Sequence, residues 1–147
     1  MKKILVLCSG NSCRSQMAEG YLTYYAKGNV KIFSAGLESH GVHPMAVEVM
    51  AEDSIDISHQ PSKALDALSR KKFDYLITVC EEARVALPAH FKFKKKKHFD
   101  IPDPAKFRGT DEETREVFRQ AREQIKKAIL KFIGQELLAD STPYNYA

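Results

Sequence analysis

The sequence lacks long hydrophobic runs and has few cysteines. No apolar stretch approaches the ~20 residues that a membrane-spanning helix needs. The apolar run at residues 4–7, after Lys2 and Lys3, is too short for a secretory signal. Three cysteines in 147 residues do not make a disulfide scaffold, and they are more typical of a protein in a reducing compartment. We therefore expect a cytoplasmic protein with no membrane partner.

The chain also lacks a strong excess of charge of one sign. Its formal net charge of +4 is modest; it would help to attract an anionic substrate but does not argue for a nucleic-acid partner. The one dense basic run, residues 94–97, is typical of a solvated loop or strand edge, with anion steering as the alternative. No repeat, low-complexity segment or oligomer signal is present. We expect a monomer with a single domain over residues 1–138 and a loose tail at residues 139–147.

One short segment concentrates chemically useful residues between a predicted strand and a predicted helix. The strand covers residues 2–7, and a helical pattern follows at residues 14–27. The first N–H groups of such a helix lack internal partners and carry the positive end of the helix dipole, so the junction can cradle a tetrahedral oxyanion. The oxyanion-binding candidates are Cys8, Ser9, Gly10, Asn11, Ser12, Cys13 and Arg14.

Individual residues of this loop fit separate roles. Cys8 is the candidate nucleophile, as a thiolate stabilised by the surrounding donors. Gly10 allows a turn where a side chain would clash, and Asn11 tolerates left-handed backbone angles. Arg14 offers a planar fork that matches two oxygens of the anion, and the Ser15 hydroxyl can donate to the sulfur. The alternative, a buried strand-end cysteine beside a surface arginine, is disfavoured by the full Cys-x5-Arg-Ser spacing.

Strand and helix patterns alternate along the chain, which predicts an α/β fold. We expect a three-layer sandwich, with a four-stranded parallel sheet and helices on both faces. Right-handed crossovers on both sides of the first strand give the strand order 2-1-3-4. Strands are expected at residues 2–7, 30–35, 73–79 and 95–99, and helices at residues 14–27, 43–52, 64–71 and from Thr110 onward.

The last helix carries two clear signals. Thr110 and Glu113 have the spacing of a capping box. Apolar residues at helical spacing then predict a face that packs into the core, and we assign it no function. That face consists of Val117, Ala121, Ile125, Ala128, Ile129 and Phe132.

At residues 8–20, CSGNSCRSQMAEG, the chain resembles the low-molecular-weight protein tyrosine phosphatases and the arsenate reductases built on the same fold. The string is similar to the arsenate reductase branch, because the phosphatases typically have Pro where Gln16 stands. The resemblance runs over roughly residues 2–135 and implies a low-molecular-weight phosphatase-like domain. It also implies that Cys80, after the predicted third strand, is a second redox cysteine.

The three cysteines differ in what is expected of them. In the strand order 2-1-3-4, Cys8 and Cys80 end neighbouring strands about 4.8 Å apart. A disulfide needs Cα atoms about 4.4–6.8 Å apart, so a bond between them is feasible after a small loop motion. Without the resemblance, a buried strand cysteine is an equally good interpretation of Cys80. Cys13 is expected to pack inward, with redox contact to Cys8 as the alternative.

Asp103 is the candidate general acid. It lies within residues 98–105, a second match to the superfamily, which carries an Asp-Pro pair here. The flanking prolines restrict its backbone, and a carboxylic acid above the anion can protonate a leaving oxygen. The phosphatases usually continue with aromatic residues that stack on phosphotyrosine, whereas Ala105 follows here. Asp100 is a nearby alternative without the Asp-Pro context.

The chain departs from the thioredoxin-coupled arsenate reductases in two respects. Those enzymes have a third cysteine a few residues beyond the second, and residues 81–88 contain none. Some of them bind potassium through Asn, Glu, Ser and Asp. Asn11, Glu19 and Ser34 match the first three, but Lys63 stands where the Asp is expected. We expect the Lys63 ammonium to replace the ion and order the loop, with no metal or other cofactor.

Two enzyme functions follow from the resemblance. In the first, Cys8 attacks arsenate, Asp103 protonates the departing oxygen, and Cys80 forms a disulfide with Cys8 that a small thiol, glutaredoxin or thioredoxin reduces. The missing third cysteine favours a small thiol or glutaredoxin. In the second, a phosphomonoester is hydrolysed through a phosphocysteine at Cys8 that water opens. A non-enzymatic anion sensor is disfavoured, because Cys8, Arg14 and Asp103 are all intact.

Overall fold

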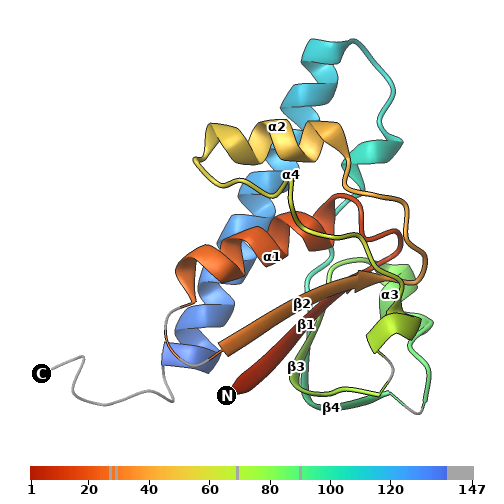
Figure 1. The fold of residues 1–147 in the computed structure, drawn as a ribbon. Helices are drawn as coiled ribbons and strands as arrows, with labels where there is room; N and C mark the ends of the chain where they lie inside the picture. Colours follow the sequence, from red (N-terminus) through yellow and green to blue (C-terminus); the bar gives the residue numbers. More distant parts are fainter. Residues whose placement is uncertain (27, 29, 69, 90, 139–147) are drawn as a thin grey trace, which may run out of the picture.

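Four parallel strands form one sheet in the order β2-β1-β3-β4 (Figure 1), as the sequence predicts. The computed structural model describes residues 1–26, 28, 30–68, 70–89 and 91–138, and the predicted tail lies outside them. The strands are β1 (Lys2–Cys8), β2 (Val30–Gly36), β3 (Lys72–Thr78) and β4 (Lys92–His98). The strand order brings the carboxyl ends of β1 and β3 side by side, because β1 pairs with β3 from Ile4 to Leu7.

Helices surround the sheet, which confirms the predicted α/β class. The α-helices are α1 (Arg14–Tyr25), α2 (Pro44–Glu52), α3 (Glu81–Val85) and α4 (Asp111–Phe132). The shorter elements are the 3-10 turns η1 (Leu65–Leu68) and η2 (Pro104–Lys106) and the π-helical segment η3 (Ile133–Leu138). In Figure 1, α1, α2 and α4 gather together, and α3 stands apart beyond the strand ends. None of the helices in the described residues combines the length and the apolar character needed to cross a membrane.

Most element boundaries differ from the sequence prediction by one or two residues, and two elements differ by three. β4 begins at Lys92, three residues before the predicted start, because its backbone pairs with β3 from Lys72 onward. Strand pairing here outweighs the low strand propensity of lysine, and the exposed lysines blunt the outer edge of the sheet. The helix predicted at residues 64–71 is only the short turn η1.

The core sits around β1 and one face of α4. Residues 4–7 of β1 are fully buried, as expected for a central strand covered on both faces. On α4, Ala121, Ile125, Ile129 and Phe132 are buried as predicted, and so is Phe118, whose ring packs against the ring of His43. Two predicted core residues, Val117 and Ala128, are only half-buried.

The start of α4 is held as the sequence predicts. Thr110 Oγ1 accepts a hydrogen bond from the Glu113 N–H at 3.1 Å, and Glu113 Oε1 accepts one from the Thr110 N–H at 2.9 Å. This reciprocal pair is a capping box. It fixes where α4 begins, directly after the loop that carries Asp103.

Candidate active site

The loop between β1 and α1 is tied on its outer side to the segment that follows β2. Four carbonyl groups of the loop accept backbone hydrogen bonds of 2.9–3.1 Å from residues 37–43. The N–H and C=O of a planar trans peptide point in opposite directions, so the amide hydrogens of these four peptides point inward. The bonds join Cys8 to Leu37, Ser9 to Glu38, Gly10 to His40 and Ser12 to His43. The loop therefore offers a preformed ring of donors to an anion.

Two glycines and an asparagine make this close approach possible. A Cβ on Gly36 would come within 2.5 Å of the Asn11 nitrogen, and a Cβ on Gly10 would come within 2.7 Å of His40 Nδ1. Asn11 has a φ of 48°, the left-handed conformation that asparagine tolerates. The predicted reasons for Gly10 and Asn11 in the loop are thus borne out.

A directed chain of hydrogen bonds reaches the Cys8 sulfur. Asn11 Nδ2 donates to Ser15 Oγ at 2.9 Å, and Ser15 Oγ lies 2.8 Å from Cys8 Sγ. Because Ser15 accepts from Asn11, its own hydroxyl hydrogen is free to donate to the sulfur. Asn11 Nδ2 also donates to Ser34 Oγ at 3.0 Å, and Ser34 donates to Glu19 at 2.5 Å. The chain therefore places a hydroxyl donor against the Cys8 sulfur.

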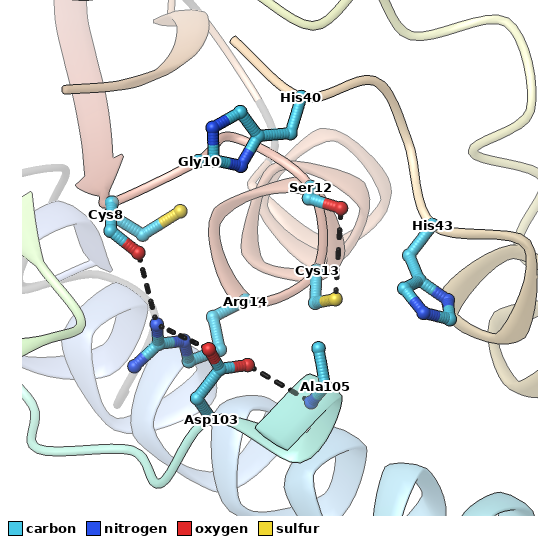
Figure 2. Close-up of a pocket in the computed structure, with 10 residues that line it drawn as sticks. Cys8, Gly10, Ser12, Cys13, Arg14, His40, His43, Asp103 and Ala105 are labelled. Carbon is cyan, nitrogen blue, oxygen red and sulfur yellow. Dashed lines mark hydrogen bonds and ion pairs between the residues drawn. The ribbon is translucent and has the colours of Figure 1, made fainter. Parts of the chain in front are cut away.

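Arg14 and Asp103 meet at one side of the loop (Figure 2). Arg14 Nη1 donates to the Ile101 carbonyl at 3.0 Å, and Nη2 lies 3.5 Å from Asp103 Oδ2 and 3.4 Å from Ser9 Oγ. The other Asp103 oxygen accepts from the Ala105 N–H at 3.0 Å. These contacts place the predicted anion-binding guanidinium of Arg14 and the predicted general acid, Asp103, in one pocket.

The predicted role of Lys63 needs a correction. Its ammonium donates to the Pro61 carbonyl at 3.3 Å in an exposed contact, and the described contacts do not include it among the groups that hold the loop. The ordering contact comes instead from the Lys63 backbone N–H, which donates to Asn11 Oδ1 at 2.6 Å. Gln16 Nε2 adds a second bond to the same oxygen at 3.1 Å. Side-chain direction could not be predicted, since it depends on how residues 60–63 fold back onto the loop.

All three cysteines are free thiols, and all are buried. Cys80 caps the start of α3, where its sulfur accepts from the Ala83 N–H at 3.4 Å. Burial raises the pKa of Cys80, and the nearby Cys8 and Glu82 act in the same direction. Burial also raises the pKa of Cys13 to about 12. Cys13 therefore stays protonated at neutral pH, which favours the packing interpretation over redox contact.

The site opens into a pocket of about 310 Å³ (Figure 2). Two histidines in its lining were not predicted; the available signal was their position after a strand end, at the sheet edge where α/β proteins bind ligands. Within the described part of the chain, no cluster of three or more His, Cys, Asp or Glu could hold a metal ion. The lining residues are Cys8, Ser9, Gly10, Ser12, Cys13, Arg14, His40, His43, Asp103 and Ala105.

Comparison with known proteins agrees with this geometry. A family model for low molecular weight phosphotyrosine protein phosphatases matches residues 3–142. Arsenate reductases of Halalkalibacterium halodurans and Bacillus subtilis are 47% and 40% identical to the chain over 131 residues, 89% of this chain and 94% of each relative. A solved structure of an arsenate reductase in the phosphate binding state has a TM-score of 0.77 at 36% identity, over 92% of this chain and 98% of that chain. The chain therefore belongs to the low molecular weight phosphotyrosine protein phosphatase family.

Proposed function

We propose that the protein is an arsenate reductase that works through Cys8 and a Cys8–Cys80 disulfide. The observation that carries the proposal is the pairing of an anion loop over Cys8 with a second free thiol, Cys80, at the end of the neighbouring strand. The relatives that are 40–47% identical to the chain are arsenate reductases. A cysteine-based phosphatase needs only the first thiol, whereas a reductase needs both.

The first step is an attack on the bound oxyanion. The inward amides and the Arg14 guanidinium hold arsenate, and the Cys8 thiolate attacks arsenic. A sulfur–arsenic bond forms and one arsenic–oxygen bond breaks. The departing oxygen takes a proton from Asp103 and leaves as water. Ser15 Oγ lies 2.8 Å from the Cys8 sulfur, close enough to donate a hydrogen bond to it.

The second step transfers the electrons. The Cys80 thiolate attacks Cys8 Sγ, so a disulfide forms and the sulfur–arsenic bond breaks. The electron pair of that bond stays on arsenic, which goes from As(V) to As(III) and leaves as arsenite. Cys80 sits at the amino end of α3, so we infer that this short helix moves when the two sulfurs join.

The third step restores the two thiols. One external thiolate attacks the disulfide to give a mixed disulfide, and a second thiol releases the enzyme as a dithiol. We infer a small thiol or glutaredoxin as the reductant, because residues 81–88 carry no third cysteine to receive the disulfide. This chemistry requires a reducing compartment, and we infer the cytoplasm.

Phosphomonoester hydrolysis is the alternative that the same loop would support. It uses Cys8, Arg14 and Asp103 and leaves Cys80 idle. Ala105 follows the acid in the pocket, and none of the described residues that line the pocket is Phe or Tyr. A pocket without such a ring offers little stacking to phosphotyrosine. We therefore expect only weak hydrolysis of aryl phosphates.

Replacing Cys80 with serine separates the two functions. Arsenate-dependent thiol oxidation and aryl phosphate hydrolysis would be measured side by side in wild type and Cys80→Ser. The reductase assignment predicts that Cys80→Ser loses arsenate turnover and largely retains aryl phosphate hydrolysis. The retained hydrolysis then shows that the anion loop of the variant is intact. Unchanged arsenate turnover in Cys80→Ser, or none in wild type, would contradict the assignment.

A further inference from the structure

His43 lies at the end of the anion pocket across from Cys8 (Figure 2). The pocket holds about 310 Å³, whereas one water molecule takes up about 30 Å³ in the liquid. A four-oxygen anion seated in the loop therefore leaves space beyond it. His43, Ala105 and Cys13 bound that outer space. A polar group there can select what the pocket accepts next to the anion.

The hydrogen-bond pattern of His43 fixes its tautomer. The Met45 N–H donates to His43 Nδ1 at 3.0 Å, as part of the cap that starts α2. A ring nitrogen that accepts carries no hydrogen, so the neutral ring has its hydrogen on Nε2. Burial lowers the pKa of His43 below its usual value, with Asp103 opposing this in part. At neutral pH the ring is therefore an uncharged donor through Nε2.

Three contacts hold the ring in place. The His43 backbone N–H donates to the Ser12 carbonyl at 3.0 Å, which ties the residue to the anion loop. The ring lies 4.9 Å from the Phe118 ring of α4, centroid to centroid. Pro44 restricts the His43 backbone to an extended conformation. A donor held in this way loses little entropy when it binds a ligand.

We propose that His43 is a substrate-binding residue whose Nε2–H donates to the anion oxygen opposite the Cys8 sulfur. In an in-line displacement, the leaving oxygen lies on the far side of the central atom from the attacking sulfur. That side faces His43, since Cys8 and His43 stand at opposite ends of the pocket. The same oxygen takes the Asp103 proton. His43 and Asp103 both line this pocket, so His43 can hold the oxygen that Asp103 protonates.

Two substitutions of His43 separate pocket binding from helix capping. In His43→Asn the amide oxygen takes the position of Nδ1 and keeps the α2 cap, while the NH2 group takes the position of Cδ2 and does not reach the position of Nε2. In His43→Gln the amide nitrogen takes the position of Nε2, so the variant keeps the donor and weakens the cap. His59→Asn, at an exposed histidine outside the pocket, is the control for replacing a histidine with asparagine at a position away from the anion. The probe is inorganic phosphate.

Phosphate affinity would be measured by how well phosphate protects Cys8 from iodoacetamide, and folding by the thermal midpoint. We expect His43→Asn to bind phosphate roughly tenfold more weakly at an unchanged midpoint. His43→Gln should bind phosphate within about threefold of wild type at a lower midpoint. Retained affinity in His43→Asn, or equal losses in both variants, would overturn the proposal, and His43→Asn, which keeps the cap, decides it alone if His43→Gln does not fold.

The leaving-oxygen part of this role rests on the proposed function, but the phosphate measurement does not. Arsenate turnover in the same proteins keeps the two apart. If wild type reduces no arsenate, the reductase assignment fails while the phosphate result still tests His43. If His43→Asn binds phosphate like wild type, the His43 proposal fails while the reductase assignment stands.

Discussion

The surroundings of Cys8 and Cys80 differ in how firmly they are held. The Cys8 loop is bonded on its outer side to residues 37–43 and from beneath by the side chains of Asn11 and Ser15. The Cys80 sulfur accepts the Ala83 N–H at 3.4 Å, its carbonyl accepts the Arg84 N–H at 3.2 Å, and both donors belong to the helix of five residues that Cys80 caps. The difference follows the proposed chemistry, because binding an anion needs fixed donors whereas disulfide formation needs one thiol to move.

The same contacts show that moving the Cys8 loop would cost more free energy than moving α3. Freeing the Cys8 loop would leave buried polar groups without partners, at about 1–3 kcal/mol each. The ion pairs of α3, between Arg84 and Glu81 and between Lys106 and Glu82, are exposed, and exposed pairs contribute only about 0–1 kcal/mol. We therefore expect α3 to be the part that moves.

Replacing Arg14 with lysine should give the largest effect. Lysine is a compact charge without the planar fork, so it cannot hold two anion oxygens and the Ile101 carbonyl together. We expect kcat/KM to fall about 10²–10³-fold for arsenate and for an aryl phosphate alike. Steady-state kinetics on both substrates would check this. A variant within threefold of wild type would show that the backbone amides suffice.

Asn11→Ala should show that the Cys8 loop contributes more to the stability of the fold than α3 does. The change removes both donors of the Asn11 amide and leaves an alanine at a φ of 48°, where a Cβ is strained. We expect the free energy of unfolding to drop by about 3 kcal/mol. The matched variant on the mobile side, Arg84→Met, should change it by less than about 0.5 kcal/mol. Urea denaturation of both would check this, and equal effects would contradict the comparison.

The pH dependence of arsenate turnover tests the Cys80 side. Burial raises the pKa of Cys80, so its thiolate fraction at neutral pH is small and grows about tenfold per pH unit. If the Cys80 attack limits the rate, arsenate turnover should rise by up to about tenfold between pH 7 and pH 8. Aryl phosphate hydrolysis does not use Cys80 and should lack this rise. Identical pH profiles for the two reactions would argue against a limiting role for Cys80.

Lys63→Met should have the smallest effect. The Lys63 ammonium contacts only the Pro61 carbonyl among the contacts described for it, and the backbone N–H that orders Asn11 remains in the variant. We expect the unfolding free energy to change by less than about 0.5 kcal/mol. Activity should not respond to potassium beyond the response to sodium. A strong loss of stability would restore the ammonium as the ordering group.

The sequence predicted best where local order sets the structure. The strand–loop–helix junction of Cys8 to Ser15 and the Thr110 capping box depend on neighbouring residues, so their spacing was enough. It predicted less well where contacts between segments far apart in the sequence determine the structure. The direction of the Lys63 side chain depends on how it meets Asn11, and His43 reaches the pocket only because the chain after β2 folds along the loop. β4 was placed too late because its run of lysines has no apolar alternation.

The most direct test of the central claim is to locate the disulfide after a single turnover. Reduced protein would be mixed with one equivalent of arsenate without external thiol, alkylated, and mapped by peptide mass spectrometry while released arsenite is counted. The account predicts one arsenite per chain, a Cys8–Cys80 disulfide, and alkylated Cys13. Arsenite release with all three cysteines alkylated, or a disulfide that contains Cys13, would contradict it.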